Sequence, residues 1–189
     1  MHSFVDLDGL RITSQPSLKI LGFMIAGDLS MGDHVGLVSR KFYASLWKLR
    51  HLKRVGITAR DLVKIYSTAL RPIIEYAAQV YASMLTAAQE EIIERMQRTA
   101  LKIIYGPGYS YRETILESGL EKLSERRETL ARKFAISTYE NQRYAHWFPK
   151  NEEIPHDLRK RLTIKETRPR TERMRKSSVY QMVKIINSL

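Results

Sequence analysis

The sequence predicts a mainly α-helical protein with a small N-terminal β-hairpin and strand unit, a helical bundle and a basic C-terminal extension. Apolar residues recur at helical spacing over most of residues 31–142. Short apolar runs bounded by turn residues occur only in residues 4–25. A chain of 189 residues can bury one sizeable core, or one core plus a loosely attached tail.

The strand signals lie in the first 25 residues. Phe4–Ile12 has apolar residues on both sides of Asp8-Gly9, a dipeptide suited to a tight turn, which predicts a hairpin. A second apolar run, Leu18–Ile25, follows Pro16 and predicts one further strand. A sheet of roughly three strands is marginal alone, so we expect these strands to lie against helices or to belong to a larger sheet.

Helical periodicity and capping signals divide the rest of the chain. The apolar pattern predicts a long helix over 32–53 and a second that starts at Thr58, with a kink or a new segment at Pro72. Further start and stop signals predict a helix from Thr86 to about 105, a short one near Ser110 and a longer one over 124–142, against which Trp147-Phe148-Pro149 would dock. Residues 150–178 then read as a mobile basic arm before a last apolar turn over 179–189.

Charge gives the first indication of a partner. The chain has 32 Lys and Arg against 20 Asp and Glu, a net charge of +12, and a pI of about 9.9. This excess favours a polyanion, either nucleic acid or an anionic membrane surface. No apolar run reaches the roughly 18 residues of a membrane span, and charged residues interrupt any signal-peptide pattern. We therefore expect a soluble intracellular protein, nuclear or cytoplasmic, that has no membrane partner.

Several kinds of chemistry find no support in the composition. The chain has no cysteine, and its five histidines show no ligand-like spacing. Asp6 and Asp8 could form a metal-binding pair, but Asp8 belongs to the Asp-Gly turn and no third acid is near. Since phosphate-loop and hydrolase motifs are also missing, we expect no catalytic residue, no metal and no cofactor.

A first basic block with interleaved aromatic residues lies in the long helix expected over 32–53. On a helix, Phe42, Leu46 and Leu49 would turn inward while the basic residues face outward toward phosphates. A solvated helix face is the alternative, although a stretch of one sign serves solubility less well than mixed charges. The block contains no acid, and its candidate nucleic-acid-binding residues are Arg40, Lys41, Lys48, Arg50, Lys53 and Arg54, with Phe42, Tyr43 and Trp47 between them.

A second basic block lies in the expected arm. It carries a local charge of +7, since only Glu166 and Glu172 oppose it. Such arms bind phosphates without reading sequence. A disordered solubilising tail or a nuclear-import signal explains the block equally well. Its basic residues are Arg159, Lys160, Arg161, Lys165, Arg168, Arg170, Arg173, Arg175 and Lys176, of which all but Lys165 are candidate nucleic-acid-binding residues.

A series of short motifs resembles the downstream end of reverse transcriptases of LINE-type, non-LTR retrotransposons, particularly the jockey-like group. Each motif is only moderately specific, but their order and spacing extend over nearly the whole chain. The matching stretches are Leu18–Phe23 (LKILGF), Leu46–Leu52 (LWKLRHL), Ile65–Ala77 (IYSTALRPIIEYA), Met96–Ile104 (MQRTALKII), Leu123–Arg127 (LSERR) and Arg170-Thr171.

The resemblance implies a division of the chain into three parts. Residues 1–30 would be a remnant of the palm sheet with a primer-grip-like strand, whose backbone near Leu21 and Gly22 holds the primer end. Gly22 would allow close approach of a sugar-phosphate chain. Residues 31–106 would be a helical thumb-like bundle, and 107–189 a helical C-terminal extension with the basic arm over 150–178.

Two departures from the family pattern shape the functional expectation. The motif with paired catalytic aspartates is absent, and Lys184–Leu189 lacks the tryptophan that tends to precede Asn-Ser-Leu-Pro. We therefore expect a non-catalytic C-terminal fragment of an RNA-directed DNA polymerase. It would grip RNA, DNA or RNA–DNA hybrid through the backbone, and the remainder of a reverse transcriptase would be a further partner. The alternatives are a stand-alone basic helical interaction module and a decayed retroelement product with no nucleic-acid role.

Overall fold

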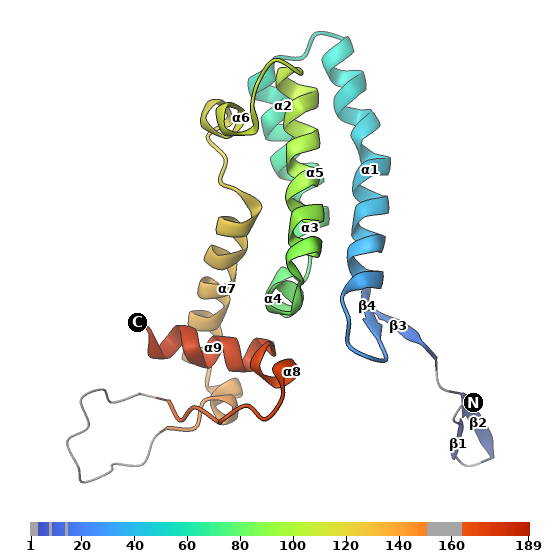
Figure 1. Ribbon diagram of the computed structural model, residues 1–189, viewed down its shortest axis with the longest axis vertical. Helices are drawn as coiled ribbons and strands as arrows, with labels where there is room; N and C mark the ends of the chain where they lie inside the picture. Colours follow the sequence, from blue (N-terminus) through green and yellow to red (C-terminus); the bar gives the residue numbers. More distant parts are fainter. Residues whose placement is uncertain (1–3, 8, 14, 151–163) are drawn as a thin grey trace.

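A computed structural model describes residues 4–7, 9–13, 15–150 and 164–189, and helices predominate among them (Figure 1). Two small β-hairpins lie at the N-terminal end. The long helix α1, Gly32–Arg54, begins beside the second hairpin and runs along one side of the helical bundle. The expected class, mainly α with a small N-terminal β unit, is confirmed.

The N-terminal strands form two separate antiparallel pairs. Strands β1, Phe4–Leu7, and β2, Leu10–Thr13, make the hairpin expected around Gly9. Strands β3, Ser17–Ile20, and β4, Phe23–Ala26, make a second hairpin.

The single strand expected over Leu18–Ile25 is therefore wrong. Leu21 and Gly22 form a two-residue turn in the middle of that run, with φ of +48° and +87°. Positive φ at both central positions suits the twist of a hairpin. Leucine rarely adopts this conformation, so the apolar pattern conceals the turn.

Helix α1 packs against α5, Ala87–Tyr105, and these two helices frame the larger hydrophobic core. Between them the chain makes several short helical segments. Pro72 lies in the first turn of a new segment, as its missing amide donor requires. The segments are α2, Ala59–Ile65; a π-helical turn, Tyr66–Leu70; α3, Arg71–Glu75; α4, Ala78–Tyr81; and a 3₁₀ turn, Ala82–Met84.

The helix starts follow the capping signals of the sequence. The side chain of Thr58 accepts a hydrogen bond from the Asp61 amide at the start of α2. Thr86 before α5 and Ser110 before α6, Tyr111–Ser118, each make a complete capping box. These caps satisfy amide groups that the first helical turn leaves without an internal partner.

A buried polar network lies within the larger core. Its apolar residues include Phe42, Leu46 and Leu49, which face inward from α1 as expected. The Tyr66 hydroxyl donates to Gln97 Oε1 over 2.8 Å. The Gln97 amide nitrogen in turn donates to the Glu121 carbonyl over 2.8 Å, so the network links α5 to the segment before α7.

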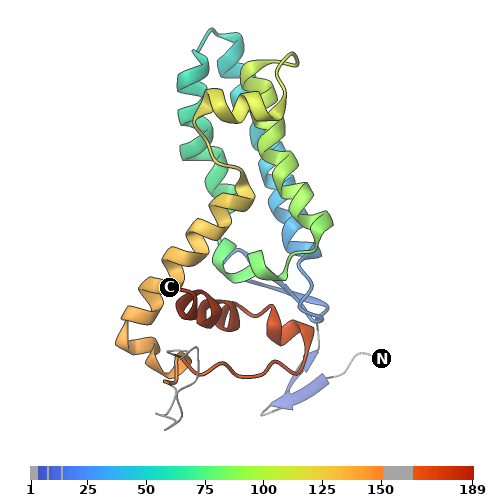
Figure 2. The same ribbon diagram turned by 60° about the vertical axis from the view of Figure 1, so that its left-hand side comes forward.

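A second, smaller core joins the C-terminal elements. Helix α9, Ser178–Asn187, lies across the lower end of α7, Leu123–Glu140 (Figure 2). A 3₁₀ segment, Gln142–Trp147, leads to Phe148, whose ring packs edge-on against Tyr139 at 5.5 Å between centroids. The expected docking of this segment is confirmed. The buried members of the core are Ala135, Phe148, Ile164, Met182, Val183 and Ile186.

The expected mobile arm over 150–178 is wrong for the part that the structure describes, residues 164–178. Ile164 is fully buried, and its backbone amide and carbonyl both hydrogen-bond to the Asn187 side chain, over 2.9 and 3.0 Å. Residues Glu172–Arg175 form the short helix α8, and the Ser83 hydroxyl donates to the Lys176 carbonyl over 2.6 Å. The described part of this segment is therefore bound to the body of the protein.

Candidate nucleic-acid interface

One face of α1 carries a row of cations and aromatic rings. Its members follow one another at spacings of three, four, three and four residues, which places them within an arc of about 80° on a helix. The row is about 21 Å long at 1.5 Å per residue. We call it the α1 stripe, and it consists of Arg40, Tyr43, Trp47, Arg50 and Arg54, all of them exposed.

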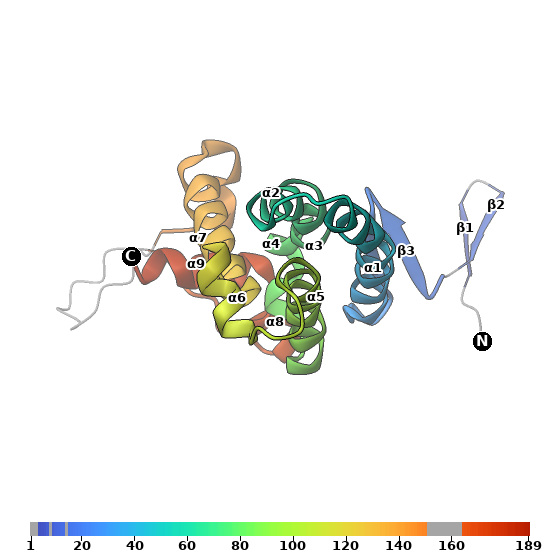
Figure 3. The ribbon, with the colours of Figure 1, turned by 90° about the horizontal axis from the view of Figure 1, so that it is seen from above.

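The α1 stripe lies at the edge of the helical bundle. Residues Phe42, Leu46 and Leu49 bury an adjoining side of α1 against the larger core. In Figure 3, the view from above, α2 and α5 lie on one side of α1, and the hairpin strands lie on its other side. The rings on the stripe are accordingly open to solvent, with 59% of Trp47 and 40% of Tyr43 exposed.

From His34 onward, the charge along this helix is of one sign. Residues 34–60 contain seven Lys and Arg and no Asp or Glu. Within the described part of the chain, none of the ion pairs involves a basic residue of α1. Such a surface attracts phosphate groups without first having to break an internal salt bridge.

A groove of about 350 Å³ brings two of the expected site residues together at the base of α1. Gly22 of the hairpin turn and Lys41 of α1 both line it, opposite Tyr76. The Tyr76 hydroxyl donates a hydrogen bond to the Leu21 carbonyl, which fixes the turn against the helices. A side chain at Gly22 would meet the Tyr76 ring at 3.6 Å and would be strained by the positive φ.

His34 forms the inner wall of the same groove. Its Nδ1 accepts a hydrogen bond from the Met24 amide, and its ring packs against Phe23 at 4.2 Å between centroids. Burial lowers the pKa of His34 below its ordinary value, and the positive charge of Lys41 lowers it further. The groove therefore holds a neutral imidazole, and Lys41 supplies the positive charge on its wall.

Lys53 differs from the other expected site residues of α1. Its ammonium donates a 2.8 Å hydrogen bond to the Ile103 carbonyl near the end of α5. A cation is favourable at that position because the last carbonyls of a helix carry partial negative charge. Lys53 thus joins two helices, and it points away from the α1 stripe.

The residues of the second basic block lie in different surroundings. Arg159, Lys160 and Arg161 lie outside the described residues. Arg173 donates to the Asp28 carbonyl over 2.7 Å, which ties α8 to the loop before α1, and Arg175 forms an exposed ion pair with Glu172 at 3.1 Å. The remaining described members make no side-chain ion pair with the described carboxylates, and they are Lys165, Arg168, Arg170 and Lys176.

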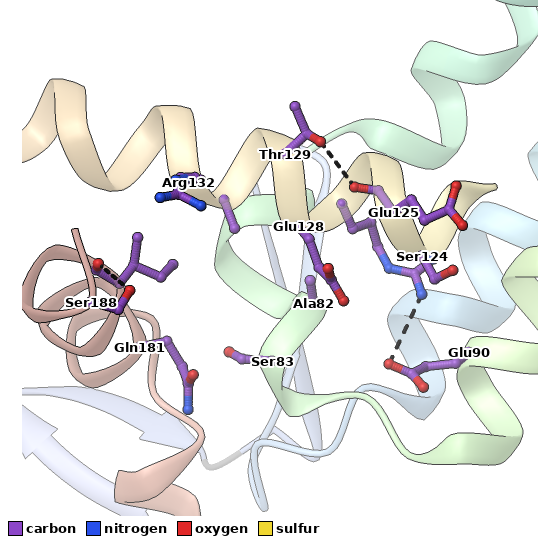
Figure 4. A pocket seen from close by; sticks show the side chains of 13 residues that line it. Ala82, Ser83, Glu90, Ser124, Glu125, Glu128, Thr129, Arg132, Gln181 and Ser188 are labelled. Atoms are coloured by element: carbon purple, nitrogen blue, oxygen red, sulfur yellow. Dashed lines mark hydrogen bonds and ion pairs between the residues drawn. The ribbon is translucent and has the colours of Figure 1, made fainter. Parts of the chain in front are cut away.

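A separate cleft of about 610 Å³ lies between α7, α9 and the start of α5 (Figure 4). Its lining mixes both charges, since Glu90, Glu125 and Glu128 share it with Arg127 and Arg132. The Arg127 side chain is buried, and its nearest carboxylate oxygen, on Glu90, is 3.9 Å away. With more carboxylates than guanidinium groups, this cleft does not suit a polyanion.

Three residues of this interface were not among those predicted to bind nucleic acid: Tyr43, Trp47 and Tyr76. Tyr43 and Trp47 were noted between the cations, and projecting residues 40–54 onto a helical wheel would have placed both on the cationic face. Tyr76 gave no such signal, because its contact with the Leu21 carbonyl joins positions 55 residues apart. Only the folded arrangement reveals that contact.

No cluster of three or more His, Cys, Asp or Glu side chains that could bind a metal occurs among the described residues. No helix in the described ranges has both the length and the apolar character needed to cross a membrane.

Comparisons with known proteins give no relatives. No protein-family model matches the chain, and neither the curated proteins nor the solved structures contain a match.

Proposed function

We propose that this chain binds nucleic acid along α1 and is a non-catalytic, nucleic-acid-gripping part of a non-LTR retrotransposon reverse transcriptase. The observation that carries the binding proposal is the acid-free stretch of α1 from His34 to Arg54, whose exposed cations extend over about 21 Å. The order of the sequence motifs supports the link to the polymerase family. Polymerisation would then depend on a palm domain with paired aspartates.

The proposed binding is directed at the sugar-phosphate backbone. Arginine and lysine side chains on a straight helix can each meet a phosphate, and the length of the stripe corresponds to about six nucleotides of one duplex strand at 3.4 Å each. Phosphate contacts position a protein on nucleic acid without reading its sequence. RNA, DNA and RNA–DNA hybrid are therefore all expected ligands, with little dependence on base order.

Charge reversal on α1 tests the proposal. The variant Arg40→Glu/Lys41→Glu/Lys48→Glu/Arg50→Glu is compared with the native chain for binding to a labelled RNA–DNA hybrid by fluorescence anisotropy. If about four phosphates are neutralised, native affinity falls roughly a hundredfold between about 50 mM and about 200 mM salt. The α1 variant is expected to lose most of its affinity and most of this salt dependence.

A matched control separates the position of the charges from their number. Arg95→Glu/Lys102→Glu/Arg112→Glu/Lys133→Glu changes the net charge equally at exposed residues outside α1. The control is expected to bind the hybrid much more tightly than the α1 variant. Equal affinity for the two variants would contradict the proposal and favour the alternative, a basic helical module whose charge serves solubility or a protein partner.

A further inference from the structure

The two aromatic rings of the α1 stripe have an exposure that phosphate binding does not explain. Trp47 is 59% exposed and Tyr43 is 40% exposed, on a helix whose Phe42, Leu46 and Leu49 are fully buried in the core. They are neighbours at an i, i+4 spacing, with Arg40 on one side and Arg50 on the other. A surface that met only phosphates would gain little from two rings at its centre.

We infer that the α1 stripe binds an unpaired strand of nucleic acid, whose bases stack on Trp47 and Tyr43 while its phosphates meet the flanking arginines. This inference rests on the proposed function and specifies the form of nucleic acid that the surface takes. Bases of a duplex are stacked on one another and do not present their faces to a protein surface. Bases of a single strand are free to stack on aromatic side chains, whatever their sequence.

The spacing of the rings supports an extended strand. Tyr43 and Trp47 are four residues apart, which corresponds to about 6 Å along the helix axis. Successive bases of a duplex strand are only about 3.4 Å apart, so two neighbouring bases could occupy both rings only after unstacking from each other. The arginines at the two ends of the stripe would then hold the phosphates on either side of the stacked bases.

The distribution of charge argues against a second copy of this chain as the occupant. Two α1 stripes placed face to face would bring their arginines together, with no carboxylate in residues 34–60 of either copy to balance them. Like charges in such an interface are unfavourable. A polyanion with aromatic bases complements both the charge and the rings.

Fluorescence of Trp47 gives a direct test. Trp147→Phe serves as the background, because Trp147 packs against Tyr144 at 4.9 Å between centroids and phenylalanine preserves an aromatic ring there. Oligo(U) and oligo(dT) are titrated into this protein, with a duplex of equal length as the comparison. The single strands are expected to quench the fluorescence of Trp47 strongly, and the duplex weakly.

Substitutions then separate stacking from charge. Trp47→Ala is expected to weaken single-strand binding about tenfold and duplex binding by less than about twofold, since each stacked base contributes measurably. Trp47→Phe should restore most of the single-strand affinity. Tyr109→Ala, which removes a ring of similar exposure elsewhere, should leave the single-strand affinity unchanged. Circular dichroism confirms that each variant folds.

The outcomes distinguish this inference from the proposed function. If the chain binds duplex in a salt-dependent way but Trp47→Ala leaves single-strand affinity unchanged, or weakens both forms equally, stacking is excluded and backbone binding stands. If no nucleic acid binds, both proposals fail. If Trp47→Ala alters only the sedimentation of the free protein, the stripe is a contact between copies, and the inference is overturned.

Discussion

The hydroxyl of Tyr66 and the side-chain carbonyl of Gln97 form a 2.8 Å hydrogen bond at the centre of the larger core, where both residues are fully buried. The bond joins the π-helical turn before α3 to the middle of α5. Because Gln97 also donates to Tyr111 and to the Glu121 carbonyl, all of its polar atoms have partners. The Gln97 side chain thus connects the π-helical turn, α6 and the segment before α7 to α5.

Removing this hydroxyl is expected to destabilise the protein. Tyr66→Phe leaves Gln97 Oε1 buried without a donor, at a cost of about 1–3 kcal/mol in the free energy of unfolding. Urea denaturation followed by circular dichroism measures the change. The control Tyr109→Phe removes an exposed hydroxyl and should stay within about 0.5 kcal/mol of the native chain. A loss no larger than that of the control would show that the buried bond contributes little.

Stability should also fall at alkaline pH. Burial raises the pKa of Tyr81 to about 12, and it raises the pKa values of Tyr66 and Tyr111 as well. The unfolded chain releases these protons near the ordinary tyrosine pKa of about 10. The neutral phenols therefore favour the folded state fully below about pH 10, and this contribution is lost as the pH rises toward 12.

The urea concentration at the midpoint of unfolding, measured from neutral pH to about pH 11, tests this fall in stability. Tyr81→Phe should show a shallower decline than the native chain, because it lacks one of the protons responsible. It should also be less stable at neutral pH, since the Tyr81 hydroxyl donates to the Ile74 carbonyl over 2.7 Å. Parallel curves for the two proteins would contradict the assignment to Tyr81.

The sequence allowed most helices to be predicted, but not the turn at Leu21-Gly22 or the attachment of residues 164–178. Helices follow from local periodicity and caps, such as the capping box at Thr86. The attachment depends on the pairing of Asn187 with Ile164, which are 23 positions apart and show no shared pattern. Local signals could not predict a contact made across the fold.

The candidate interface was likewise predictable only in part from the sequence. The cations of α1 could be identified from composition alone, and their outward orientation followed from the helical spacing. The role of Lys53 could not be anticipated, because its partner carbonyl at Ile103 is brought near only by the packing of α1 against α5. The groove at Gly22 and Lys41 likewise exists only because the hairpin folds back on the helices.

The Asn187 side chain is expected to control access to the segment that follows Ile164. Asn187→Ala removes both hydrogen bonds to the Ile164 backbone and the 3.3 Å contact with Glu166. Limited proteolysis with trypsin should then cleave faster after Lys165 and Arg170, as identified by mass spectrometry. Ser188→Ala, which removes only a hydroxyl bonded to the preceding turn, serves as the control. Equal cleavage rates in the two variants would show that other contacts hold the segment.

The hydrogen bond from Arg173 to the Asp28 carbonyl joins positions 145 residues apart in the sequence. This contact can form only after Arg173 has been synthesised, long after the loop before α1. Closing so long a loop also slows folding, because its entropy is lost before the contact forms. During synthesis, the base of α1 would therefore reach its final surroundings only after Arg173 has been added.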